Sequence, residues 1–256
     1  MLKHRVIPSL LLSEGSLVKT IRFKNPEYVG DPINVIRIFN DKEVDELAIF
    51  DIVASKKERE PDYDLIEQFA AECFMPLSYG GGIRNIDQAR RIFSLGVEKI
   101  CLQSSILSNS AFIRELVSQF GSQSIMVSLD IKKNWRGNPK LYQSSSGKLI
   151  DVDWLEEMQR LVLAGAGEVV LNAVDKDGTL AGPDLSLIKQ ASSAIGVPLI
   201  CLGGVSSLAD IKACVDAGAS AVAAGAFFVY YGKHRAVLIT YPSYDELEYL
   251  FNPSSI

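Results

Sequence analysis

The sequence predicts a single (β/α)8 barrel. Eight short apolar runs recur along the chain, and most lack the period-two alternation of a half-exposed strand, which is typical of parallel strands buried on both faces. Amphipathic stretches separate these runs, so strand and helix alternate. The chain has 256 residues, and one barrel of this kind takes about 250. An open doubly wound sheet would leave the number of units unexplained.

The expected strands cover residues 5–10, 47–51, 75–79, 99–103, 124–130, 168–172, 198–202 and 220–224. Helices are expected at 62–73, 85–95, 110–120, 153–164, 185–193 and 208–217. We expect one domain over residues 1–256.

Composition and charge exclude several classes of protein. The formal net charge is −5, which argues against an electrostatic nucleic-acid binder. No apolar run reaches the ~18 residues of a membrane span. Four widely spaced cysteines match no zinc or disulfide framework and indicate a reducing cytoplasm. We therefore expect a cytoplasmic protein without a metal or cofactor.

The sequence also repeats itself. Gly81-Gly82-Ile83, a helix and then Gly96-Val97 are matched, at the same spacing, by Gly203-Gly204-Val205, a helix and Gly218-Ala219. Such a repeat predicts two half-barrels of four units each, and hence an equivalent site in each half.

Glycine clusters after the third and seventh strands predict two phosphate sites. Without a Cβ, glycine lets backbone N–H groups approach an anion closely. A lone Gly-Gly is more often a tight turn, but here two clusters stand in register, and each is followed by a loop that can begin a helix. The first site would use Gly81, Gly82, Gln103 and Ser104, and the second Gly203, Gly204, Ala224 and Gly225. Together they suit a ligand with a phosphate at each end.

Several segments carry a family resemblance: FDIVAS (50–55), GGGIRN (80–85), FGSQSIMVSLDIK (120–132), GAGEVVLNAVDKDGT (165–179) and LGGVSSLADI (202–211). Over about residues 1–230 the chain resembles the HisF family, the cyclase subunit of imidazole glycerol phosphate synthase. The resemblance implies a barrel that binds a phosphoribosyl-linked bisphosphate. It also implies ammonia supplied by a HisH-like glutaminase docked on the N-terminal face.

The resemblance places the catalytic aspartate at Asp130. Family members have a second aspartate opposite, at the end of the first strand, but this sequence has Leu11 there. Since leucine cannot transfer a proton, cyclase activity is doubtful. Glu14 could replace the missing acid only if its loop folded back.

Further ligand contacts follow from the resemblance. Lys19 would lie in a flexible loop from residue 12 to 31 that closes over the ligand, or else be a solvated loop lysine. Asp51 ends the second strand, where a carboxylate is typical of a functional role. Asp177, Gly178 and Thr179 would support the second phosphate site.

Arg5, Glu46, Lys99 and Glu168 stand at the starts of four strands. Solubilising charges are one interpretation. The resemblance implies another, in which these four residues form the ring that gates ammonia at the bottom of the barrel.

Divergent HisF paralogues occur in gene clusters for surface polysaccharides, where a third enzyme converts a sugar acetamido group to an acetamidino group. We predict this type: an ammonia-channelling subunit with a glutaminase partner, a phosphorylated ligand and a sugar amidotransferase as candidate third component. The alternatives are a true cyclase of histidine biosynthesis and a non-catalytic assembly scaffold. The divergent tail, about residues 230–256, includes an apolar stretch at 236–242 that is more typical of a strand than of a helix.

Overall fold

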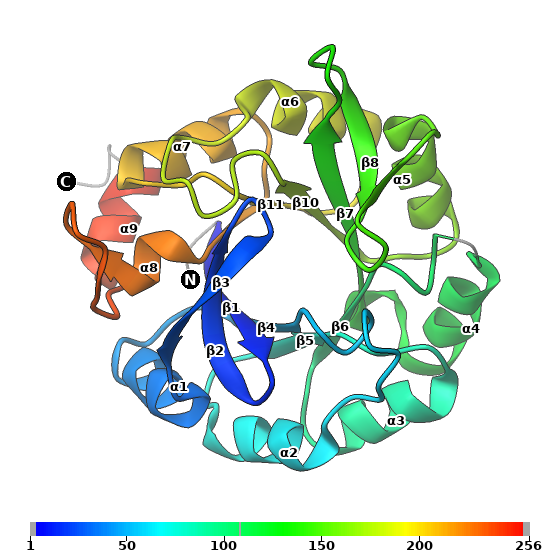
Figure 1. Cartoon of the computed structure of the whole chain (residues 1–256), viewed down its shortest axis with the longest axis horizontal. Helices are drawn as coiled ribbons and strands as arrows, with labels where there is room; N and C mark the ends of the chain where they lie inside the picture. Colours follow the sequence, from blue (N-terminus) through cyan, green and yellow to red (C-terminus); the bar gives the residue numbers. More distant parts are fainter. Residues whose placement is uncertain (1–3, 108, 253–256) are drawn as a thin grey trace.

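A computed structural model describes residues 4–107 and 109–252; the ends of the expected domain at 1–3 and 253–256, and residue 108, lie outside the described residues. In the described part, parallel strands close into a barrel (Figure 1). The closing pair is β12 with β1, in register from Arg5 opposite Ala221. The barrel strands are β1 (Arg5–Ser13), β4 (Leu47–Asp51), β5 (Leu77–Gly80), β6 (Lys99–Leu102), β7 (Ile125–Lys133), β10 (Glu168–Ala173), β11 (Leu199–Leu202) and β12 (Ala221–Ala224). The predicted fold class is confirmed.

Helices form the outer layer of the barrel (Figure 1). They are α1 (Pro32–Asp41), α2 (Tyr63–Glu72), α3 (Ile86–Ser94), α4 (Ala111–Phe120), α5 (Trp154–Leu163), α6 (Leu185–Ala194) and α7 (Leu208–Asp216), with a 3-10 turn at Ser122–Ser124. The short helix α8 (Ala226–Val229) follows β12, and its first residue lines the cavity described below. Six of the helices were predicted to within one residue at each end. Side-chain caps fix most of these starts; Asp62, for example, accepts a hydrogen bond from the Leu65 amide.

Two apolar layers hold the barrel. The larger lies between strands and helices and includes Phe39, Phe69 and Trp154. A smaller cluster takes side chains from seven of the barrel strands, which places it in the interior: Ile7, Ala48, Cys101, Met126, Val170, Ile200, Ala221 and Ala223. Small and aliphatic side chains therefore line the barrel axis.

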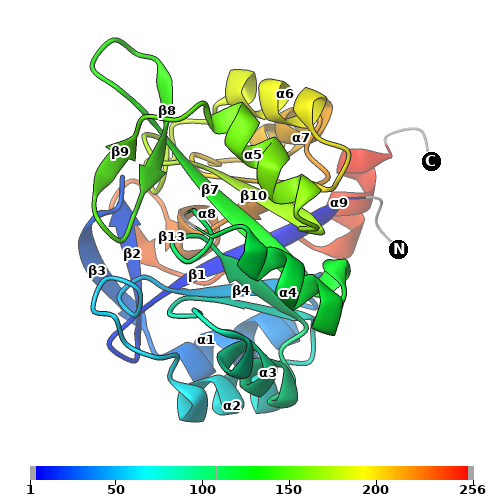
Figure 2. The same ribbon diagram turned by 90° about the vertical axis from the view of Figure 1, so that its right-hand side faces the viewer.

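Two β-hairpins extend the barrel at the C-terminal ends of its strands (Figure 2). The first is β2 (Ser16–Ile21) with β3 (Lys24–Gly30), and the second is β8 (Pro139–Gln143) with β9 (Lys148–Ile150). Each adds antiparallel to a barrel strand that runs on past the barrel. The prediction of a flexible loop at residues 12–31 is wrong, because this segment pairs with β1 and buries Leu17 and Val18.

The tail forms a two-stranded ribbon and a final helix. β13 (Tyr230–Tyr231) pairs with β14 (Ala236–Val237), and α9 (Tyr244–Phe251) begins at a Ser243 capping box. The predicted strand at 236–242 is therefore correct only for its first two residues. Figure 2 shows α9 beside the start of β1, at the end of the barrel opposite the hairpins. None of the helices in the described ranges is both long and apolar enough to cross a membrane.

Candidate active site

A cavity opens where the barrel strands end, beneath the two hairpins. Its empty volume, part of it open to solvent, is about 1090 Å³. Nine of the predicted site residues line it: Lys19, Asp51, Gly81, Gln103, Ser104, Asp130, Asp177, Gly178 and Gly225. Gly82 lines an adjoining hollow of about 570 Å³, together with Gly81 and Ser104. The structure thus brings most of the predicted residues together.

Asp130, on β7, is almost fully buried in the wall of this cavity. Burial raises its pKa to about 7, with a further contribution from the charge of Asp177, while hydrogen bonds from Gln103, Asn172 and Ser144 oppose the rise. The side-chain amide of Gln103 donates directly to the carboxylate. A carboxyl group with this pKa gains and loses a proton near neutrality, as general acid–base catalysis requires.

Leu11, on β1, lines the same cavity. It pairs in the sheet with Phe50 and Val18, neither of which can transfer a proton. Glu14 does not replace the missing acid. It sits at the β1–β2 turn with a positive φ of 49° and pairs with Lys57 at 2.5 Å and Arg59 at 3.0 Å. Half of its side chain is exposed, away from the cavity lining.

Lys19 is buried, so the interpretation as a solvated loop lysine is wrong. Its ammonium donates to the Ser9 carbonyl at 2.5 Å. Burial lowers the Lys19 pKa to about 8, and the charge of Asp177 opposes this effect. A Cβ at Gly225 would collide with the Lys19 ammonium. The β2–β3 hairpin therefore places a cation directly against the second glycine loop.

Two further residues predicted for the second site, Gly204 and Thr179, accept or donate local hydrogen bonds. Gly204 has a φ of 95°, and its carbonyl accepts a hydrogen bond from the Gly182 amide at 2.9 Å. The Thr179 hydroxyl donates to the Lys176 carbonyl within its own turn. Neither these two residues nor Gly203 and Ala224 appear in the lining of the main cavity. Of the residues predicted for the second site, Gly225, Asp177 and Gly178 line the cavity.

Asp51 orders the loop after β4, because one of its oxygens accepts from the amides of Val53 and Ala54 at 2.8 and 2.9 Å. That loop carries Lys56 into the main cavity. Arg84 lines the hollow beside Gly82. Sequence reasoning missed both cations, although basic residues after barrel strands are the signal that could have found them.

Ser144 is a further missed residue. It lies in the β8–β9 turn, and its hydroxyl donates to the Gln103 side-chain oxygen at 2.7 Å. Ser104 donates to the same oxygen at 3.2 Å. The two serines orient the Gln103 amide so that its nitrogen faces Asp130. Across the described chain, no group of three or more His, Cys, Asp or Glu is arranged to hold a metal ion.

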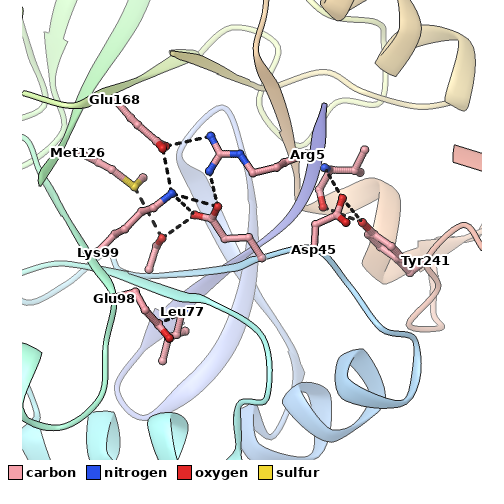
Figure 3. Close-up of polar contacts among 11 residues, drawn as sticks. Arg5, Asp45, Leu77, Glu98, Lys99, Met126, Glu168 and Tyr241 are labelled. Carbon is pink, nitrogen blue, oxygen red and sulfur yellow. Dashed lines mark hydrogen bonds and ion pairs between the residues drawn. The ribbon is translucent and has the colours of Figure 1, made fainter. Parts of the chain in front are cut away.

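At the other end of the barrel the four charged strand-start residues form a closed ring (Figure 3). Arg5 contacts Glu46 at 2.5 Å and Glu168 at 3.2 Å. Lys99 contacts the same two glutamates at 3.3 and 2.9 Å. Charges of opposite sign alternate around the ring, and Glu46 is only 3% exposed. These residues are therefore paired to one another and are more than solubilising charges.

The ring lies directly below the barrel interior. The Ser78 hydroxyl donates to Glu46 at 2.8 Å and contacts the Met126 sulfur. Burial raises the pKa of the Cys101 thiol, and the charges of Asp130 and Glu168 raise it further. Both carboxylates therefore act on this interior residue, one from the cavity and one from the ring. Uncharged side chains fill the interior between the two ends of the barrel.

The histidine biosynthesis protein family matches residues 5–235. The chain belongs to this family, within its HisF branch. It is 47% identical over 253 residues to the "Putative imidazole glycerol phosphate synthase subunit hisF2" of Pseudomonas aeruginosa, covering 97% of this chain and 99% of the relative. It is 48% identical to the "Putative imidazole glycerol phosphate synthase subunit HisF" of Leptospira borgpetersenii, with 98% and 100% covered.

A third HisF-family relative is less similar. The "Imidazole glycerol phosphate synthase subunit HisF" of Alkaliphilus metalliredigens is 34% identical over 231 residues, covering 90% of this chain and 92% of the relative. The first two similarities extend over nearly the full chain, whereas the family match ends at residue 235. This HisF-family chain thus shares more of its length with the first two proteins.

Proposed function

We propose that this chain is the ammonia-channelling subunit of a glutamine-dependent synthase. It receives ammonia from a HisH-like glutaminase docked at the N-terminal face. The observation that carries the proposal is the ring of Arg5, Glu46, Lys99 and Glu168, which closes the barrel floor beneath an apolar interior. The family members similar to this chain are named as synthase subunits.

The physical chemistry of ammonia supports such a route. In water near neutrality ammonia is mostly protonated and has no lone pair to donate. An apolar interior disfavours the charged ammonium ion and so favours the neutral nucleophile. The ring charges are tolerable because each has a partner, and movement of one long side chain would open a passage.

The cavity suits an anionic ligand of the bisphosphate type. Lys19 and Lys56 bring positive charge into it. Gly81 and Gly225 line the cavity on two sides, and glycine backbone can come close to an anion because it has no Cβ. Gly82 and Arg84 extend the first side into the adjoining hollow. A phosphate in each half would neutralise these cations.

The replacement of the second acid by Leu11 supports a role in sugar amidination. In this role the chain delivers ammonia, and a separate sugar amidotransferase replaces the acetamido oxygen with the ammonia nitrogen, so that the oxygen leaves as water. The cavity then needs only one general acid–base group, Asp130, or none.

A true cyclase of histidine biosynthesis is the second candidate. It is favoured by the pKa of Asp130, which is raised to about 7 and suits proton transfer. The names of the relatives favour it as well.

Reconstitution separates the two candidates. The chain is combined with a HisH-like glutaminase and a sugar amidotransferase, and an acetamido sugar is offered with either glutamine or ammonium chloride. Omitting the chain should abolish only glutamine-driven conversion. If instead the chain alone turns over the family's bisphosphate substrate with ammonium chloride at an ordinary cyclase rate, the second candidate function, a true cyclase, is correct.

A further inference from the structure

The C-terminal tail contacts the strand that carries Arg5 (Figure 3). The Tyr241 hydroxyl donates to the Val6 carbonyl at 2.8 Å and lies 3.5 Å from the Asp45 carboxylate. The Val6 amide donates to the same Asp45 oxygen at 3.1 Å. Tyr241, Val6 and Asp45 therefore form one small network that joins the tail to the starts of two barrel strands.

This network lies next to the ring along the chain. Val6 follows Arg5, and Asp45 precedes Glu46. Arg5 and Glu46 make the shortest contact of the ring, at 2.5 Å. The tail also reaches the other neighbour of Arg5, since the Phe251 ring packs against His4 at a centroid distance of 5.3 Å. Arg5 is thus bracketed by two tail contacts.

Tyr241 is held firmly enough to act as a support. Its ring packs against Phe228 at a centroid distance of 5.3 Å. Burial raises the pKa of the Tyr241 hydroxyl, and so the group remains a hydrogen-bond donor at any physiological pH. The hydrogen bond from this hydroxyl restrains the backbone at Val6, the residue that follows Arg5 on β1.

We propose that Tyr241 is a positioning residue of the ring, which holds Arg5 and Glu46 in contact through Val6 and Asp45. The role of this support in ammonia passage rests on the proposed function, whereas its effect on ring geometry does not. The supporting residue lies beyond residue 235, where the family match ends. Ring geometry in this chain therefore depends on a segment outside the shared family core.

Chemical labelling of Lys99 tests the proposal without a partner or substrate. In the closed ring Lys99 is 17% exposed and bonded to two glutamates, so acetic anhydride should modify it slowly. Tyr241→Phe keeps the packed ring and removes only the hydroxyl. The labelling rate of Lys99, relative to the exposed Lys189, should rise about fivefold, as loss of one hydrogen bond would give.

Controls keep the result interpretable. Tyr249→Phe changes an exposed tyrosine of the same tail and should leave the Lys99 rate unchanged. Asp45→Ala removes the carboxylate that contacts both Val6 and Tyr241, and it should also raise the labelling rate of Lys99. Wild-type Lys99 rates in both Tyr241→Phe and Asp45→Ala, with cooperative unfolding retained, overturn the proposal.

The reconstituted complex then distinguishes this inference from the proposed function. Tyr241→Phe should lower the ratio of glutamine-driven to ammonium-driven conversion. Faster Lys99 labelling with an unchanged ratio of glutamine-driven to ammonium-driven conversion supports the positioning role and contradicts the proposed ammonia relay. Unchanged Lys99 labelling contradicts the positioning role and does not affect the proposed ammonia relay.

Discussion

The Nζ atom of Lys99 lies 2.9 Å from Oε1 of Glu168, and this contact completes a ring in which every charge has two opposite neighbours. Charged groups at the start of a strand usually extend into water. The side chains of Lys99 and Glu168 are only 17% and 12% exposed, and partly buried charges are stable only when paired. The ring should therefore respond as a unit when one member is removed.

Lys99→Ala should lower the free energy of unfolding by roughly 1–3 kcal/mol. This is below the ~3–5 kcal/mol of a broken buried pair, because Arg5 still contacts both glutamates. Urea unfolding measures the change. Lys57→Ala is the matched control, since its pair with Glu14 is half exposed and worth at most about 1 kcal/mol. Equal losses in the two variants would contradict a cooperative ring.

Leu11→Asp should raise cyclase turnover of the family's bisphosphate substrate by about tenfold or more. It restores a group able to transfer a proton across the cavity from Asp130, and such a group typically contributes ~10²–10⁴-fold. The assay uses ammonium chloride as nitrogen donor. Leu11→Asn, which has similar size but no acid, should stay at the wild-type rate. A wild-type rate already equal to that of ordinary HisF proteins would refute the prediction.

Asp130 should titrate near pH 7, as its burial dictates. Carbon-13 NMR of the labelled carboxyl group measures this directly. Asp177→Asn removes a neighbouring negative charge and should lower the pKa, whereas Gln103→Leu removes a hydrogen-bond donor and should raise it. An Asp130 pKa near 4 in the wild type would show that the carboxylate is solvated.

The same shift predicts how stability depends on pH. Between about pH 4 and pH 7 the folded state holds a proton on Asp130 that the unfolded state has lost. The contribution of Asp130 to the free energy of unfolding therefore decreases as the pH rises through this window. Above about pH 7 it no longer changes with pH. The Asp130→Asn variant should lack this slope when the two proteins are compared by urea unfolding across the window.

Two sulfate ions should bind at the C-terminal face in crystals grown from concentrated sulfate. One should lie near Gly82 and Ser104, and the other near Gly225. Lys19→Met should weaken binding at the second position about tenfold, because a charge-assisted hydrogen bond is worth ~1.5–3 kcal/mol. Phosphorus NMR with inorganic phosphate measures the change. Both positions empty at high sulfate would contradict the two-site interpretation.

The barrel was predictable because its signals are local. Apolar runs and amphipathic stretches mark strands and helices by period alone. The helix α1 was not predicted, although Asp31 caps it and Pro32 occupies its first turn, which is a readable start signal. The two hairpins were missed because their strands form only by pairing with extensions of β1 and β7.

The site was predictable where a residue type is tied to its position. Asp130 follows from its strand end and the family motif. The burial of Lys19 does not, because it depends on how the β2–β3 hairpin packs over the barrel. Ser144 carries no local signal, since the β8–β9 turn brings it to Gln103. Gly204 was predicted to contact a phosphate, and only the structure shows that its backbone packs against Gly182.

Isotope dilution in the reconstituted complex tests the ammonia relay most directly. Glutamine labelled with nitrogen-15 in its amide is supplied together with an excess of unlabelled ammonium chloride, and the acetamidino product is examined by mass spectrometry. A closed route through the barrel predicts product that keeps nearly all of the label, and Lys99→Ala should reduce this retention. Product that carries mainly unlabelled nitrogen in the wild-type complex would contradict the relay.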